Sequence, residues 1–242
     1  MDNLKMSERI SILKDKMLSE PRYASIEQAL IITETYKNNE NKPRIIQRAL
    51  ALKNALLNLK INAEPEEMIV GNRTAGVRYG VVFPESRSTW VDKEFETLPV
   101  RPQDKFNVRE KDIKIFREII KPYWEGKSLE DVLKKEYGKE INEIAKVVKI
   151  NQKDHAQGHI CPNCEKWLKK GPAGIKAEAE KYLETASGDK KDFYESVIIV
   201  MEGVQQFIMR YCSFLLEKTE TEKDKIKKEN MILTAENCKN IS

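Results

Sequence analysis

The residues best suited to chemistry lie together in one short segment. Between Asp154 and Cys164 the chain holds both of its histidines, His155 and His159, and two of its four cysteines, Cys161 and Cys164. A Cys-x-x-Cys pair beside imidazoles is typical of half a structural zinc site, because tetrahedral zinc binds thiolates and imidazoles. The two pairs overlap here, and no distant histidine or Cys-x-x-Cys pair completes the set. We therefore predict no metal ligands, and a zinc-stabilised helical module is the less favoured hypothesis.

The same cysteines allow two other interpretations. A redox-active Cys-x-x-Cys motif needs a strand before it and a helix that opens at the first cysteine. Pro162 and the loop-like approach to Cys161 do not provide that strand, so a redox role is not favoured. The remaining interpretation is a pair of unrelated buried thiols beside a turn. Cys212, within an apolar helix, and Cys238, near the end of the chain, are most simply core thiols.

The two histidines can also serve a substrate. An imidazole in a concave site can donate a hydrogen bond to a substrate hydroxyl or accept one from it. His155 and His159 stand in the least helical segment of the chain, beside Asp154. This pattern alone makes both candidates for binding a small-molecule substrate, and it does not by itself assign that role. No residue is predicted to be catalytic, because the sequence has no phosphate-binding glycine loop, no nucleophile elbow and no informative pair of carboxylates.

Composition and charge exclude several classes of protein. The 43 lysines and arginines and the 39 acidic residues are interspersed along the chain, which does not favour binding to nucleic acid. No apolar run approaches the roughly eighteen residues that a membrane span needs. The first residues have no apolar signal-peptide core. Four cysteines without such a signal indicate reduced thiols and a cytoplasmic location.

Helical periodicity dominates the elements that must position these residues. The apolar spacing predicts a helical layer over residues 1–66, an irregular segment over 67–108 and further helices over 109–242. Within the last region, residues 151–172 break the period and form the predicted pocket segment. The most apolar helix is predicted over 193–216, where apolar residues on more than one face indicate burial on several sides.

Local signals predict where these elements begin and end. Ser7 is the predicted N-cap of the first helix, and Ser25 with Gln28 forms a predicted capping box for the second. The β-prone run 68–71 opens the irregular segment. Pro122 is predicted to end the helix that starts near residue 112, because an interior proline removes a backbone hydrogen bond.

Several stretches together resemble one known family in their order and spacing. The resemblance is to the N-terminal region of the pyruvate formate-lyase-like glycyl-radical enzymes, particularly the glycerol dehydratase-type branch. It extends over nearly the whole chain. The stretches that carry it are Ala29–Lys37, Arg48–Lys53, Glu67–Asn72, Phe83–Glu85, Glu94–Leu98, Pro122–Lys127, Gly158–His159, Glu165–Gly171 and Gly174–Ile175.

The resemblance implies a fold and an activity. The fold would be mainly α, the N-terminal helical part of a ten-stranded α/β barrel with few short strands. Complete members are lyases that carry a glycyl radical, installed by a radical S-adenosylmethionine activating enzyme. That radical generates a thiyl radical, which abstracts hydrogen from a small polar substrate. In dehydratase-type members the histidine that matches His159 contacts a substrate hydroxyl, while the resemblance does not fix the role of His155.

Two family motifs are missing from the sequence. Neither a Gly-Cys-x-Glu loop, which carries the thiyl cysteine, nor an Arg-Val-x-Gly-Tyr-like radical motif occurs before the last residue, Ser242. We therefore expect a truncated, N-terminal fragment that binds no cofactor of its own and is inert alone. It would need a missing C-terminal part, or assemble as a homodimer. The alternative is a non-enzymatic helical assembly partner that keeps the N-terminal fold.

Overall fold

The computed structural model describes residues 7–148 and 161–242. Helices dominate these residues, and the only strands among them are two of three residues each, which confirms the prediction of a mainly α fold with few short strands. The elements in chain order are α1 (Glu8–Ser19), β1 (Tyr23–Ser25), α2 (Glu27–Lys37), α3 (Arg44–Asn58), β2 (Tyr79–Val81), α4 (Ser88–Glu94), α5 (Glu110–Ile115), the π-helix η1 (Phe116–Ile120), α6 (Lys121–Trp124), α7 (Leu129–Ala145), α8 (Cys164–Leu183), α9 (Asp189–Thr221) and α10 (Lys225–Ile241).

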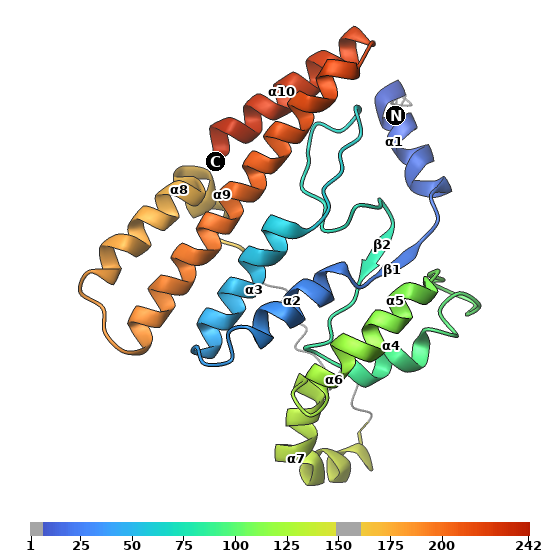
Figure 1. Ribbon diagram of the computed structural model, residues 1–242, viewed down its shortest axis with the longest axis vertical. Helices are drawn as coiled ribbons and strands as arrows, with labels where there is room; N and C mark the ends of the chain where they lie inside the picture. The colour runs from blue at the N-terminus through green and yellow to red at the C-terminus, as the bar shows by residue number, and fades with distance from the viewer. Residues whose placement is uncertain (1–6, 149–160) are drawn as a thin grey trace.

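The long helix α9 organises one half of the molecule. It has 33 residues and packs against α3, α8 and α10, so it is covered on several sides as its apolar pattern predicts (Figure 1). Tyr211 and Leu215 of α9 and Met231 of α10 are fully buried in the core between these helices. The predicted core thiols Cys212 and Cys238 are buried in the same cluster.

A second core lies between α2 and the helices α4 to α6. Phe95 and Phe116 meet edge to face with ring centroids 5.1 Å apart, a favourable arrangement of aromatic quadrupoles. The indole Nε1 of Trp124 donates a hydrogen bond of 2.8 Å to the hydroxyl of Thr33 on α2. Helix α3 joins the two cores because it packs against both α2 and α9.

The two strands pair in parallel, with Tyr23 opposite Tyr79 and Ser25 opposite Val81. The β-prone run 68–71 forms no strand, and Ile69 within it is 90% exposed. A strand needs a neighbouring backbone to pair with, and intrinsic preference for the extended conformation does not supply one. In the predicted irregular segment the ordered elements are instead β2 and the short helix α4.

Serines cap the starts of two helices, and the cap predicted at Ser7 is confirmed. The hydroxyl of Ser7 accepts a hydrogen bond from the amide of Ile10, and that of Ser128 accepts one from the amide of Asp131. Each cap provides an acceptor for an amide in the first turn of its helix.

Two other predicted helix ends are wrong. Ser25 does not cap α2, because it lies in β1 and its carbonyl accepts the amide of Val82 at 3.2 Å. Pro122 does not end its helix. It lies in the first turn of α6, directly after η1, where the amide of Lys121 reaches back to the carbonyl of Phe116. The wider π turn accommodates a proline, which has no amide hydrogen to donate.

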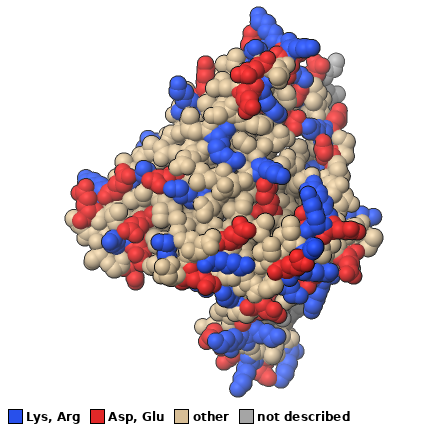
Figure 2. All heavy atoms as spheres, viewed as in Figure 1, with Lys and Arg blue, Asp and Glu red and all other residues tan. Residues whose placement is uncertain are grey.

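The surface carries both signs of charge. On the face shown in Figure 2, lysines and arginines alternate with acidic residues, and neither sign gathers into one stripe. Among residues 7–148 and 161–242, no helix combines the length and apolar content that crossing a bilayer requires.

Candidate functional site

The predicted substrate-binding residues His155 and His159 lie outside the described residues, so their role stays a prediction. The structure resumes at Cys161. Both Cys161 and Cys164 are exposed, so the interpretation of them as buried thiols is wrong. Within the described part of the chain, no three His, Cys, Asp or Glu side chains come together as a metal site would require.

Helix α8 begins inside the predicted pocket segment 151–172. The side chain of Asn163 caps it and accepts a hydrogen bond of 2.9 Å from the amide of Lys166. Near the end of this segment, Gly171 has a φ of 58° and interrupts the helical backbone before Pro172. Glycine adopts this left-handed φ at little cost. The interruption at Gly171 is therefore a kink within α8, while residues 151–160 of the predicted pocket segment lie outside the described residues.

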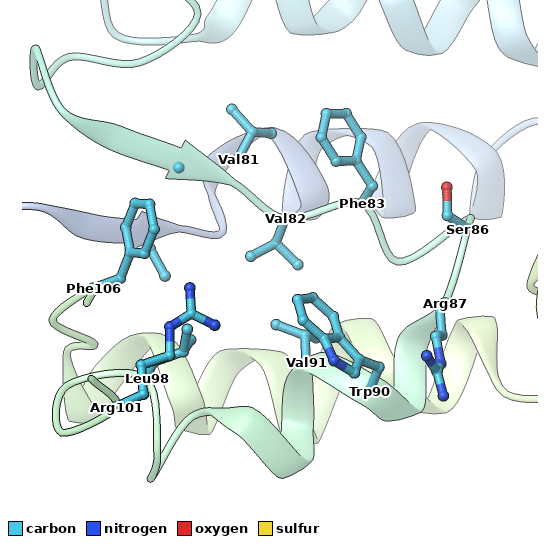
Figure 3. A pocket seen from close by; sticks show the side chains of 12 residues that line it. Val81, Val82, Phe83, Ser86, Arg87, Trp90, Val91, Leu98, Arg101 and Phe106 are labelled. Atoms are coloured by element: carbon cyan, nitrogen blue, oxygen red, sulfur yellow. The ribbon is translucent and has the colours of Figure 1, made fainter. Parts of the chain in front are cut away.

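One cavity, of about 430 Å³, lies between the β1–β2 pair and α4 (Figure 3). Its walls are mainly apolar, and two arginine side chains lie among them, as Figure 3 shows. The Nε of Arg101 donates 2.8 Å to the carbonyl of Asp104, and the Nε of Arg87 donates 2.8 Å to Glu130. The apolar wall is formed by Ala24, Val81, Val82, Phe83, Trp90, Val91, Leu98 and Phe106.

A second cavity, of about 380 Å³, lies between α2, α3, the segment 71–85 and α9, and it contains charged groups. Glu85 contributes a carboxyl group, and Arg48 and Arg73 contribute two guanidinium groups. Burial raises the pKa of Glu85, and a backbone hydrogen bond to the carboxyl together with the two arginines only partly opposes this effect. In the part of the chain that the structure describes, Glu85 Oε2 is buried without a hydrogen-bond partner.

The cavity around Glu85 is held in shape by its neighbours. The guanidinium of Arg73 donates 3.0 Å to Gln28 Oε1 and stacks over the ring of Phe83 at 5.1 Å. The carbonyl of Glu85 accepts the amide of Leu129 at 2.9 Å, which fixes the backbone beside the first turn of α7. Burial also raises the pKa of Tyr36, another wall residue, from its ordinary 10.0.

Glu85 belongs to Phe83–Glu85, one of the stretches that resemble the family, but it was not predicted to be a site residue. A carboxylate directly after the apolar run Val81–Pro84 was a signal for a buried acid. The two arginines in the same wall stand 12 and 37 residues before it, and nothing in their own spacing marks them as its neighbours.

Comparison with known proteins assigns the chain to a family. The family model of pyruvate formate lyase-like proteins matches residues 5–242. The chain belongs to this family. The chain is 29% identical, over 97% of its length, to (2S)-3-sulfopropanediol dehydratase of Klebsiella oxytoca, and 30% identical, over 88%, to the probable dehydratase YbiW of Escherichia coli strain K12. It spans 30% and 27% of the length of these two relatives.

Solved structures agree with this assignment. The glycerol-bound B12-independent glycerol dehydratase of Clostridium butyricum matches 100% of this chain with a TM-score of 0.92 and 29% identity, and the match covers 32% of that chain. A glycyl radical enzyme of Archaeoglobus fulgidus matches 96% of it with a TM-score of 0.86 and 30% identity. The predicted resemblance to the glycerol dehydratase-type branch is thus confirmed, as is the predicted fold class.

Proposed function

We propose that this chain forms the N-terminal helical part of a glycyl-radical dehydratase or lyase that acts on a small polar substrate. The observation that carries the proposal is the similarity over 100% of the chain, with a TM-score of 0.92, to a dehydratase whose structure contains glycerol. Three relatives support it by their names, (2S)-3-sulfopropanediol dehydratase, isethionate sulfite-lyase and trans-4-hydroxy-L-proline dehydratase. A substrate with a hydroxyl or a similar polar leaving group is their common feature.

The residues of this chain would bind and enclose the substrate. We propose that His159 positions a substrate hydroxyl, with His155 beside it, and that the packed helices keep water from reactive intermediates. The residues that would hold the radical are not among these 242, because neither radical-loop motif occurs in the sequence. No step of the radical reaction is therefore assigned to this chain, which we expect to be inactive alone. The activating enzyme is a partner of the complete assembly.

The proposal is tested by complementation under anaerobic conditions. The chain is incubated with a radical S-adenosylmethionine activating enzyme, with or without a polypeptide that supplies the remaining length of a relative. Electron paramagnetic resonance and product formation from 1,2-propanediol and glycerol are then measured. We expect a radical signal and turnover only in the presence of the second polypeptide. A stable glycyl signal from these 242 residues alone would overturn the proposal.

The role of His159 is tested in the complemented enzyme. His159→Ala is expected to raise KM about tenfold or more, because a hydrogen bond to the substrate is lost and its hydroxyl is left poorly partnered. His155→Ala is expected to have a smaller effect. Cys161→Ser is the matched control, since Cys161 is exposed and has no predicted role. An unchanged KM and kcat in His159→Ala would refute this assignment.

A further inference from the structure

We propose that the open edge of β2 is a docking site for an extended apolar segment of the polypeptide that supplies the remaining length of a relative. The segment would pair with the backbone of Val81 as a third strand and place alternate side chains in the cavity between the β1–β2 pair and α4. The inference rests on the proposed function for its partner, and it adds where on this chain that partner binds.

The small sheet has one strand in its middle and another at its edge. On one side of β1, the amide of Ala24 donates 2.9 Å to the carbonyl of Asn107, and on the other side the carbonyl of Ser25 accepts the amide of Val82 at 3.2 Å. In the part of the chain that the structure describes, β2 has β1 as its one neighbouring strand. The outer side of β2 is therefore open to another strand.

The backbone groups on this outer side follow from the alternation within a strand. Because the amide of Val82 points to β1, the amide and carbonyl of Val81 point outward, as do the carbonyl of Tyr79 and the amide of Phe83. No described residue forms a hydrogen bond with these four groups. A partner that covers them has to supply donors and acceptors in the same order, since buried backbone groups without partners cost free energy. An extended backbone does so when it adds a strand to a sheet edge.

The cavity beside this edge would receive side chains of the added strand. Val82 points into it, towards Trp90 and Val91 of α4 (Figure 3). Successive side chains of a strand point to opposite faces, so every second side chain of the docked segment would face this cavity. Trp90 is 44% exposed, and an apolar side chain placed beside it would remove part of its ring from water. The docked segment would thus be apolar at every second position.

The lengths of the relatives indicate where this segment comes from. The glycerol dehydratase of Clostridium butyricum matches 100% of this chain, but the match covers only 32% of that chain. Similarly, this chain spans 30% of (2S)-3-sulfopropanediol dehydratase. Most of each relative therefore has no counterpart among these residues. That part belongs to the same polypeptide in each relative, so it is present wherever the matched part is.

The proposal is tested by amide hydrogen exchange of the full chain, followed residue by residue with nuclear magnetic resonance, with and without the second polypeptide. We expect the amides of Val81 and Phe83 to exchange at least about tenfold more slowly in the complex. The amide of Val82, which is bonded to Ser25 already, is the internal control and should be protected in both samples.

The possible outcomes separate this inference from the proposed function. Binding of the second polypeptide without slower exchange at Val81 would overturn the inference and leave the proposed function standing. Absence of any binding would overturn both. Slow exchange at Val81 in the free chain that is lost on dilution would show that a second copy of the chain occupies the edge, and would overturn the inference alone.

Variants separate the backbone contribution from that of the cavity. Val81→Pro removes the outward amide but no hydrogen bond to β1, and Trp90→Ala removes the exposed ring. Each is expected to weaken binding of the second polypeptide about tenfold. Val77→Pro is the matched control, because it lies at the second position of a turn in which the amide of Tyr79 donates 3.3 Å to the carbonyl of Gly76, and proline is favoured there.

The folding of each variant is checked by circular dichroism, and its affinity is measured by calorimetry. Val77→Pro should bind as the parent does. Parent affinity in both Val81→Pro and Trp90→Ala would overturn the proposal. If Val81→Pro does not fold, parent affinity in Trp90→Ala alone is sufficient to overturn it.

Discussion

At the scale of single residues, the hydroxyl of Thr33 joins two helices of one core. It donates 2.6 Å to the carbonyl of Ala29 within α2 and accepts 2.8 Å from the indole of Trp124 on α6. Thr33 is fully buried and Trp124 nearly so. The indole N–H therefore depends on the Thr33 hydroxyl as its acceptor, because no water molecule can reach this buried position to replace it.

Replacing Thr33 by valine tests this contact. Valine has nearly the same shape but no acceptor, so Trp124 would keep a buried donor without a partner. We expect Thr33→Val to lower the free energy of unfolding by about 1–3 kcal/mol. Thr221→Val, at an exposed threonine, is the control and should change stability by less than about 0.5 kcal/mol. Urea unfolding followed by circular dichroism measures both. Equal stability of the two variants would contradict the role of the hydroxyl.

The carboxyl group of Glu85 predicts a pH dependence. Burial raises its pKa above the ordinary 4.5, so the folded chain binds this proton more tightly than the unfolded chain does. Its contribution to stability therefore falls as the pH rises through the window above 4.5. Glu85→Gln abolishes this titration.

We therefore expect Glu85→Gln to be more stable than the parent at neutral pH, with an advantage that shrinks in acid, where the carboxyl is protonated in both states. Urea unfolding at several pH values measures the difference. Glu236→Gln, at an exposed glutamate, is the control and should follow the parent. A parent that is more stable than Glu85→Gln at neutral pH would show that the carboxylate is stabilised in the folded chain.

At the scale of elements, the close crossing of α3 and α9 depends on Gly203. A Cβ at this position would lie 3.0 Å from the Cα and 3.1 Å from the Cβ of Lys53. Such distances are shorter than normal contacts between carbon atoms, and backbone atoms cannot move aside as a flexible side chain can. The missing side chain thus sets how closely the helix that joins the two cores approaches α9.

Gly203→Ala is expected to push α3 and α9 apart and to lower the free energy of unfolding by about 1–3 kcal/mol, in spite of the better helix propensity of alanine. Gly138→Ala is the matched control. Its nearest neighbour is the Cγ of Lys134 at 3.9 Å, so the same change within α7 should be neutral or stabilise by up to about 1 kcal/mol. Chemical unfolding measures the free energy of unfolding of both variants. A Gly203→Ala protein as stable as the parent would contradict the packing argument.

The sequence predicts those features of the fold that local interactions determine. Ser7 and Ser128 cap their helices through amides three residues away, so their role is visible in the sequence. Ser25 is misread because its backbone pairs with Val81, a residue 56 positions further along the chain, and no local pattern announces that pairing. The cavity around Glu85 escapes prediction for the same reason, since its walls come from α2, α3, α9 and the segment before α4.

At the scale of the whole molecule, stability is distributed unevenly. Helix α9 contributes seven buried residues, whereas α7 has none. The start of α7 is held by hydrogen bonds from Leu129 and Glu130 to the carbonyls of Glu85 and Ser86. Further along α7, apolar side chains such as Tyr137, which is 57% exposed, remain in contact with solvent.

Amide hydrogen exchange should therefore be much faster in α7 than in α9. Opening of a helix without buried side chains exposes little apolar surface and costs little free energy, whereas opening of α9 disrupts the core around Tyr211 and Leu215. We expect amides in the middle of α7 to exchange orders of magnitude faster than those in the middle of α9 when peptides are followed by mass spectrometry. Helix α10 makes extensive contacts with α9 but with no other described helix. Its amides should therefore exchange at an intermediate rate. Protection of α7 equal to that of α9 would contradict the prediction.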